Sequence, residues 1–328
     1  MSAPGNLERG ISGRWGRLKN VTIDPLEEMG LPSKGDRRLL DFSTQDMYFN
    51  TIRKRYMKFC ASSGGGPQLE NLFSSLFISA NTGLADECDD LAKDPNDQSS
   101  SKTPGPYVED RATERELSTL LMAMRKLREA IVASNRLDRF SINVYVYSIR
   151  ASILAKHVES YHPALLHLLR ALHPASPQSL SRSDYRELTG YLVLDLACRQ
   201  QDFAAAYSVR RALAHDRPPF DAAQEQPPLY AGTGRVDAIL RAMVHDDYHL
   251  FWRMKQGVDG YQARLMEFAE EGMTRVALKC LGRTYLNVEK SFVVKVTGGK
   301  TWEELKEKYE VGWELKGAMV IIRKPRGR

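Results

Sequence analysis

Two histidines four residues apart are the first candidates for chemistry in this sequence. His245 and His249 lie in a segment expected to be helical, and Asp246 and Asp247 stand between them. Histidines at this spacing on one helix can bind a metal ion. No nearby glutamate or third ligand completes the His-Glu-x-x-His pattern of zinc hydrolases. We therefore expect no metal site.

Glycine-rich and serine-containing segments offer no catalytic loop either. Gly64-Gly65-Gly66-Pro67 lacks the Lys-Ser/Thr of a phosphate-binding loop, and Gly232-Thr233-Gly234 fails for the same reason. The sequence has no Gly-x-Ser-x-Gly nucleophile elbow. We expect a protein that is not an enzyme, with no catalytic residues, no cofactor and no small-molecule substrate.

Composition narrows the class of protein and its compartment. The chain has 328 residues, of which 42% are hydrophobic, and a formal net charge of +6. That charge permits an acidic partner without requiring one. The four cysteines are far apart and form no Cys-x-x-Cys pair, which indicates reduced thiols in the nucleus or cytoplasm. No apolar run approaches about 18 residues, so we expect no membrane span.

The elements that would position any functional surface are clearest between Thr274 and Lys324. A helical segment with Ala277, Leu278, Leu281 and Tyr285 on one face comes first. The apolar stretch 288–296 follows, as a short helix or a strand. Thr301 and Glu304 then have the spacing of a capping box, and two alternating runs around Gly317-Ala318 predict a β-hairpin. This order is typical of a winged helix.

The hairpin and its neighbours are the candidate partner interface. We expect Met319–Arg323 to end in an unpaired edge that a partner sheet extends. Val320 and Ile322 share one face of this strand and Met319 and Ile321 the other, so one pair covers the core. The predicted interface residues are Trp302, Trp313, Met319, Val320, Ile321 and Ile322.

A second interpretation is that the winged helix binds RNA or DNA directly. Its groove-entering helix, Thr301–Glu310, carries four glutamates against two lysines, so phosphates would repel it. Basic residues lie on the hairpin and tail instead, which favours backbone contact without base reading. These candidates are Lys316, Arg323, Lys324, Arg326 and Arg328.

The remaining sequence predicts helical hairpins between less regular segments. Ser141–Ser160 favours a helix over a strand because of its length, and Ser183–Gln200 with Asp202–His215 predicts a tight antiparallel pair. A strict repeat period is absent. The expected organisation is a disordered leader (1–38), an N-terminal helical pair (39–80), a flexible acidic linker (81–111), a helical-repeat part (112–260), a winged helix (261–324) and a basic tail (325–328).

This layout resembles the PCI domain of proteasome-lid, signalosome and initiation-factor subunits. YRELTGYLVLDLACRQQDFAAAYSVRRAL is similar to the last helical pairs of the family, and DDYHLFWRMKQGVDGYQARLMEFAEEGMTRVALKCLGRTYL to its aromatic-rich helix followed by an Arg/Ala/Leu helix. The matching positions are Phe251, Arg275, Ala277, Leu278 and Tyr285. The nearest branch contains the GANP-type mRNA-export proteins and the small lid subunit.

The resemblance implies a mainly α fold, a right-handed α-solenoid of helical hairpins capped by a C-terminal winged helix. It also implies a scaffold or adaptor in a multiprotein complex, with other PCI-type or helical-repeat subunits as partners. In the mRNA-export branch a PCI protein and its partner bind nucleic acid together. The resemblance covers roughly Thr113–Lys324 and leaves residues 1–112 without a counterpart.

Overall fold

The computed structural model describes residues 24–62, 106–178, 180–215 and 234–323. They fall into two compact units, residues 24–62 with 106–134 and the described residues from 135 onward. The fold is mainly helical, as predicted, with one three-stranded antiparallel sheet near the C-terminus. Among the described residues, no helix has the length and apolar character needed to cross a membrane.

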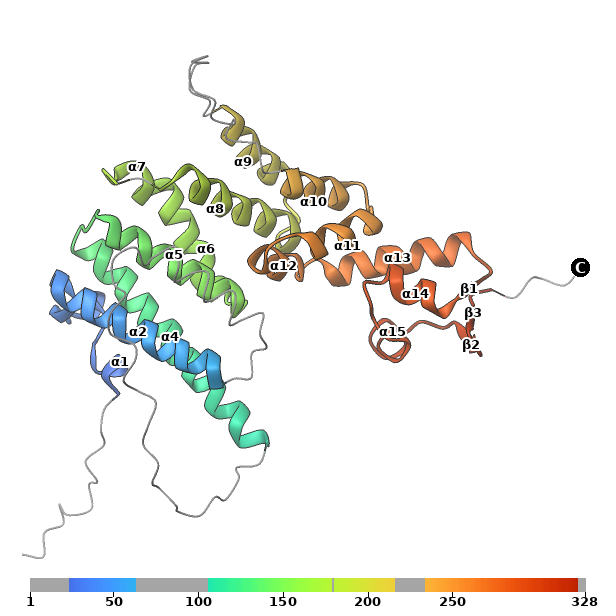
Figure 1. The fold of residues 1–328 in the computed structure, drawn as a ribbon, viewed down its shortest axis with the longest axis horizontal. Coiled ribbons are helices and arrows are strands. Elements are labelled where there is room, and N and C mark those ends of the chain that lie inside the picture. Colours follow the sequence, from blue (N-terminus) through green and yellow to red (C-terminus); the bar gives the residue numbers. More distant parts are fainter. Residues whose placement is uncertain (1–23, 63–105, 179, 216–233, 324–328) are drawn as a thin grey trace, which may run out of the picture. The chain divides into compact units, whose positions relative to one another are not determined.

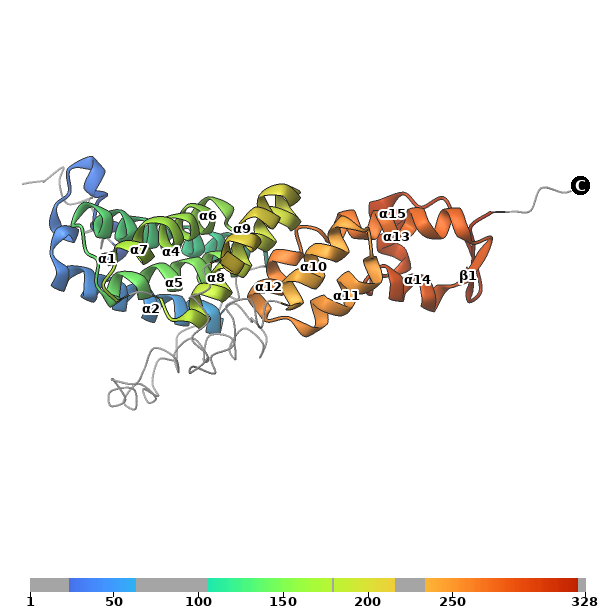
Figure 2. The same cartoon turned by 90° about the horizontal axis from the view of Figure 1, so that it is seen from above.

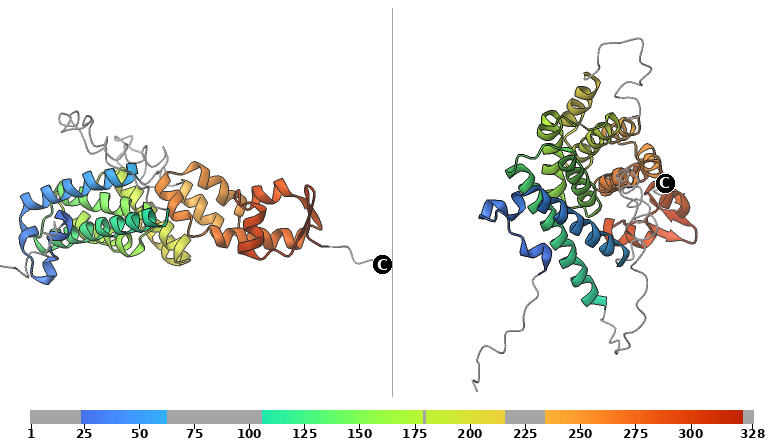
Figure 3. Two further views of the ribbon diagram at one scale, coloured as in Figure 1. Left: turned by 90° about the horizontal axis from the view of Figure 1, so that it is seen from below. Right: turned by 60° about the vertical axis from the view of Figure 1, so that its left-hand side comes forward.

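The first unit is built on two long antiparallel helices, α2 (Phe42–Ser62) and α4 (Pro106–Ala133) (Figure 3). Gln45 near the start of α2 donates to Ser134 after the end of α4 at 3.0 Å, and Arg55 donates to Glu116 at 2.7 Å. Three short helical segments pack beside them: α1 (Pro25–Glu28), η1 (Pro32–Lys34) and η2 (Arg38–Leu40).

Two boundary predictions in this unit are wrong. Residues 24–38, expected in the disordered leader, carry α1 and η1, because Asp24 caps α1 and Leu26 is buried with 1% of its surface exposed. Helix α4 begins at Pro106, inside the predicted acidic linker, and packs on α2. The second half of the predicted helical pair, after residue 62, lies outside the described residues.

The second unit opens with paired helices. The helix predicted over Ser141–Ser160 is confirmed as α5, although it ends at Leu154, and the tight pair is confirmed as α8 and α9 joined at Gln200–Asp202. The bounds are α5 Arg139–Leu154, α6 Val158–His167, η3 Leu168–Leu172, α7 His173–Ala175, α8 Arg182–Leu194, η4 Asp195–Arg199, α9 Phe203–His215, α10 Gly234–Val244, α11 Tyr248–Gly257 and α12 Gly260–Met266.

Helices α10, α11 and α12 form the next layer along this unit (Figure 2). Helix α12 packs against α5 and α8, so it belongs to the helical layers and not to the C-terminal module that was predicted to begin at 261. Tyr261 and Leu265 fix it there, because both side chains are buried.

A buried carboxylate links α6 to η4. Asp195, at the start of the π-helical turn η4, has no exposed surface. It accepts hydrogen bonds from the Tyr161 hydroxyl at 2.5 Å, from Arg199 at 2.6 and 2.7 Å, and from Gln200 at 2.9 Å. The Nδ1 atom of His162 lies 2.9 Å from Oδ2 of Asp195. A buried charge is tolerated when it is satisfied in this way.

The C-terminal module contains α13 (Glu270–Thr284), β1 (Asn287–Glu289), α14 (Lys290–Val296), α15 (Trp302–Tyr309), β2 (Glu314–Lys316) and β3 (Met319–Ile321) (Figure 1). The capping box of Thr301 and Glu304 is confirmed, as is the hairpin around Gly317, whose φ is +60°. The apolar stretch 288–296 divides between β1 and α14.

Trp252 of α11 joins the helical layers to this module. Its indole Nε1 donates to the carbonyl oxygen of Val296 at 3.0 Å, at the end of α14. A Cβ atom at Gly298 would lie 2.7 Å from the same ring, so only glycine permits this approach. Phe251, the neighbour of Trp252 on α11, is buried as well.

Candidate interaction surface

The core of the C-terminal module decides which residues remain for a partner. Its buried side chains come from every element of the module except β2, and they are Leu278, Leu281, Val288, Val293, Val296, Trp302, Leu305, Val311 and Val320. Trp313 and Ile322 are half-buried and pack against this cluster. A residue inside this core can reach a partner only if the module opens.

The predicted partner interface is therefore divided. Trp302 and Val320 keep 7% and 0% of their surface exposed, so neither side chain is accessible to a partner in this fold. Both side chains pack in the core of the module. Met319 is 40% exposed, and Ile321 is half-buried beside it on the same strand.

The prediction of an unpaired edge at Met319–Arg323 is also wrong. The strand order is β1-β3-β2, so β3 is the central strand and pairs with a neighbour on both sides. The expected division of its faces is correct: Val320 and Ile322 point to the core, and Met319 and Ile321 point away from it. The sheet edges are β1 and β2, and β2 carries the exposed charges of Glu314 and Lys316.

The face of the sheet that points away from the core is exposed. Register places Glu289, Met319 and Lys316 side by side in one cross-strand row, and Asn287, Ile321 and Glu314 in the next. We call these six residues the outer sheet face. An apolar centre on β3 is thus bordered by polar and charged residues on β1 and β2.

A second exposed apolar site lies where α13 passes into β1. Tyr285 and Leu286 keep 45% and 54% of their surface exposed, and we call them the α13–β1 corner. Tyr285 contacts Phe292 edge to face with a ring-centroid distance of 6.1 Å. The sequence pattern placed Tyr285 on the buried side of its helix, but α13 ends at Thr284 and the chain turns outward there. Leu286 was not predicted as a site residue.

Of the predicted backbone-contact residues, Lys316 and Arg323 lie within the described part of the chain. Lys316 is exposed on β2, and Arg323 donates from Nη2 to the carbonyl oxygen of Gly282 near the end of α13. This bond places Arg323 beside Arg283, which with Lys279 continues an exposed basic face of α13. Lys324, Arg326 and Arg328 lie outside the described residues.

The surface of α15 is acidic, as its sequence predicted. Glu303, Glu304 and Glu307 are all exposed. The Glu304 carboxylate accepts the backbone N–H of Thr301 at 2.7 Å, and this hydrogen bond lowers the pKa of Glu304. A carboxylate that stays charged on this helix supports the expectation that α15 repels phosphates.

The two histidines considered for metal binding do not share a helix. Helix α10 ends at Val244 and α11 begins at Tyr248, so His245 lies in the turn and His249 in the next helix. Asp246 adopts φ +56°, and Asp247 caps α11 by accepting the N–H of Leu250 at 2.9 Å. Within the described ranges, no group of His, Cys, Asp and Glu side chains is arranged to hold a metal ion.

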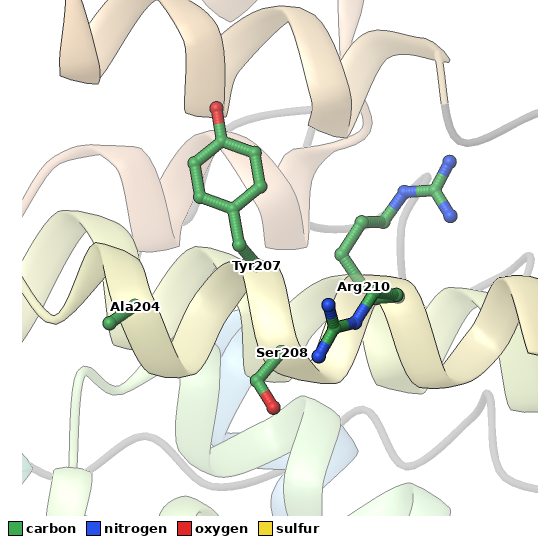
Figure 4. Close-up of a pocket in the computed structure, with 5 residues that line it drawn as sticks. Ala204, Tyr207, Ser208 and Arg210 are labelled. Carbon is green, nitrogen blue, oxygen red and sulfur yellow. The ribbon is translucent and has the colours of Figure 1, made fainter.

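A pocket of about 470 Å³ opens along α9, lined by Ala204, Tyr207, Ser208, Arg210 and Arg211 (Figure 4). Arg210 is engaged there by Asp237 of α10, with Nη2 and Oδ2 2.7 Å apart. Tyr207 keeps 47% of its surface exposed. The five lining residues include no paired carboxylates and no nucleophile with an adjacent base. They therefore lack the groups that acid–base or nucleophilic catalysis requires.

Comparison with known proteins assigns no family. No family model matches the sequence, and no curated protein matches it.

Proposed function

We propose that this chain is a non-catalytic scaffold subunit of the PCI type, and that it binds other subunits through its C-terminal module and helical layers. The observation that carries the proposal is the module's arrangement. The order α13-β1-α14-α15-β2-β3, with β3 between β1 and β2, matches the order expected of a winged helix and supports that assignment. Paired helices precede it, which supports a solenoid capped by this module.

The junction at Trp252 supports a scaffolding role. Its hydrogen bond to Val296 and its contact with Gly298 attach the C-terminal module to α11. The module and the helical layers can therefore present their surfaces to partners as one unit. Exposed apolar side chains are then the ones that we expect to contact partners. The α13–β1 corner provides two of these, Tyr285 and Leu286, on adjacent positions.

The test is capture of a complex with an amino-terminally tagged full-length chain. We expect a discrete set of helical-repeat proteins to co-purify in fixed proportion. Removing residues from Thr301 onward is a poor variant, because it deletes the core residues Trp302, Leu305 and Val320 and exposes the rest of the module's core. Leu286→Asp places a charge on the surface and should lower partner recovery at least tenfold.

The matched control is Leu137→Asp, at an exposed leucine outside the module with 37% of its surface accessible. It should leave recovery unchanged. If the chain is recovered alone, or if both variants behave alike, the scaffold proposal or its assignment to this corner fails. Circular dichroism of each variant verifies that the fold is intact.

A second function, binding of nucleic-acid backbone, is favoured by the basic face of α13. Lys279 and Arg283 are exposed, and neither forms an ion pair with a residue in the described ranges. Arg323 adds a third cation near Gly282. Three phosphate contacts give weak, sequence-independent and salt-sensitive binding.

Fluorescence anisotropy with a short single-stranded RNA and a duplex DNA tests this function. We expect similar affinities for unrelated sequences, loss of binding at moderate salt, and at least a tenfold loss in K279E/R283E. Tight, sequence-selective binding would contradict it, as would binding that the double variant leaves intact.

A further inference from the structure

The outer sheet face carries an ordered pattern of charge. In one row Glu289 on β1 and Lys316 on β2 stand on either side of Met319 on β3. The alternate row, Val288 with Val320 and Leu315, turns toward the core, so the charged row points away from it. Glu289 and Lys316 are exposed, and Met319 is 40% exposed.

The two charges do not pair with each other within one molecule. Their strands lie on either side of β3, so their Cα atoms are roughly 9–10 Å apart with Met319 between them. Neither side chain forms an ion pair with any residue in the described part of the chain. Glu289 occupies the N-cap position of α14 without a side-chain capping hydrogen bond. Both charges are therefore available to an outside group.

We propose that the outer sheet face is a self-association surface, on which the sheet of a second copy packs face to face. A two-fold axis parallel to β3 would stack β1 of each copy on β2 of the other. Glu289 of each copy then faces Lys316 of the second, so the contact contains two ion pairs. Met319 meets Met319 and Ile321 meets Ile321 at the centre, which makes the surface self-complementary.

The size of the face sets the strength of the association. A stable interface buries about 800 Å² on each partner, and six side chains supply less than that. Association is therefore weak and dependent on concentration, with a dissociation constant of roughly 10 μM to 1 mM. Because the ion pairs lie near solvent, the association weakens with salt.

Sedimentation equilibrium of the full-length chain tests the proposal. The protein concentrations should reach about 1 mM, so that they cover the expected range of the dissociation constant. The wild type should form dimers. E289K and K316E alone should each weaken dimerisation at least tenfold, because a copy with E289K presents two lysines in the row and a copy with K316E presents two glutamates. An equimolar mixture of the two variants should dimerise again, since each supplies the charge that the other lacks. The double variant E289K/K316E should also dimerise, with both ion pairs reversed.

Two charge reversals elsewhere on the module serve as controls. E307K on α15 and K279E on α13 change the net charge by the same amounts at exposed positions and should leave dimerisation unchanged. All four sites are on the surface, and thermal melts verify that each variant folds. A wild type that stays monomeric throughout overturns the proposal. So does a mixture that dimerises no better than the single variants, or a dimer that survives E289K.

Discussion

The hydroxyl of Tyr161 donates to Oδ1 of Asp195 at 2.5 Å, and neither side chain has any exposed surface. Burial by itself raises the pKa of Asp195, but hydrogen bonds from Arg199, Tyr161 and Gln200 favour the charged form more strongly. The net result is a pKa below the ordinary value of 3.8. The carboxylate therefore links α6 to η4 as a charged group, and its contribution depends on pH.

Asp195→Asn should remove this dependence. A folded-state pKa below the unfolded value contributes stability above about pH 4, and the contribution is lost as pH falls toward the folded value. At pH 7 we expect the free energy of unfolding of the variant to be about 2–4 kcal/mol lower than that of the wild type, because Arg199 is left without its carboxylate. Between pH 5 and 3 the free energy of unfolding should fall less in the variant than in the wild type. Urea denaturation at pH 7, 5 and 3 measures both effects. Asp237→Asn, which breaks the more exposed pair with Arg210, should cost under 1 kcal/mol; equal losses in the two variants would contradict the assignment.

Tyr161→Phe tests the hydroxyl alone. It removes one donor to Asp195 without leaving a large cavity, so the free energy of unfolding should fall by about 1–2 kcal/mol. The matched change is Tyr207→Phe on α9, where the side chain is 47% exposed and the expected loss is close to zero. Thermal melts of the two variants at pH 7 compare them, and an unchanged melting temperature in Tyr161→Phe would show that the hydrogen bond is not stabilising.

Gly298→Ala and Gly299→Ala separate backbone strain from steric contact at the module junction. Both glycines have positive φ, +80° and +86°, but a Cβ at 298 meets the Trp252 ring at 2.7 Å whereas a Cβ at 299 meets nothing within 4 Å. Alanine in this conformation costs about 1–2 kcal/mol at either position. The ring contact should add about 1–3 kcal/mol at 298 alone. Urea denaturation followed by tryptophan fluorescence measures the difference, and equal costs would mean that the ring moves aside freely.

Lys126→Met should loosen the segment from Asp24 to Leu40. The Lys126 ammonium is buried and donates to the carbonyl oxygen of Leu26 at 3.0 Å, and burial lowers its pKa. Without it, Leu26 keeps the hydroxyl of Tyr48 as its donor, while the end of α1 loses a favourable positive charge. Amide hydrogen exchange of Glu27 and Glu28 should become at least tenfold faster. Lys58→Met on the exposed side of α2 is the control, and unchanged exchange in Lys126→Met would disprove the role of the ammonium.

Local signals predicted most of the C-terminal module. The spacing of Thr301 and Glu304 gave the start of α15, and Gly317 gave the turn between β2 and β3, because capping and tight turns depend on neighbouring residues. The position of β3 was not predictable in this way. Its pairing with β1 joins residues separated by two helices, and no local rule ranks such partners.

Local sequence signals also predicted only part of the candidate interaction surface. An apolar stripe indicates which side of a helix is buried only while the helix continues, so it misplaced Tyr285 and gave no sign of Leu286. The expectation that His245 and His249 share one helix failed for a related reason, because the chain turns at Asp246. In the first unit, the acidic composition of 81–111 gave no sign that α4 begins at Pro106 and packs on α2.

The carbonyl oxygen of Leu286 accepts the backbone N–H groups of both Ile322 and Arg323, at 2.8 and 3.1 Å. Arg323, the last described residue, thus lies beside the point where the chain enters the sheet. A fusion protein, epitope or fluorescent label attached directly after Arg323 would begin beside Tyr285 and Leu286. Such a label would sterically compete with ligands of that corner and give false-negative pull-downs, so reporters belong at the opposite terminus.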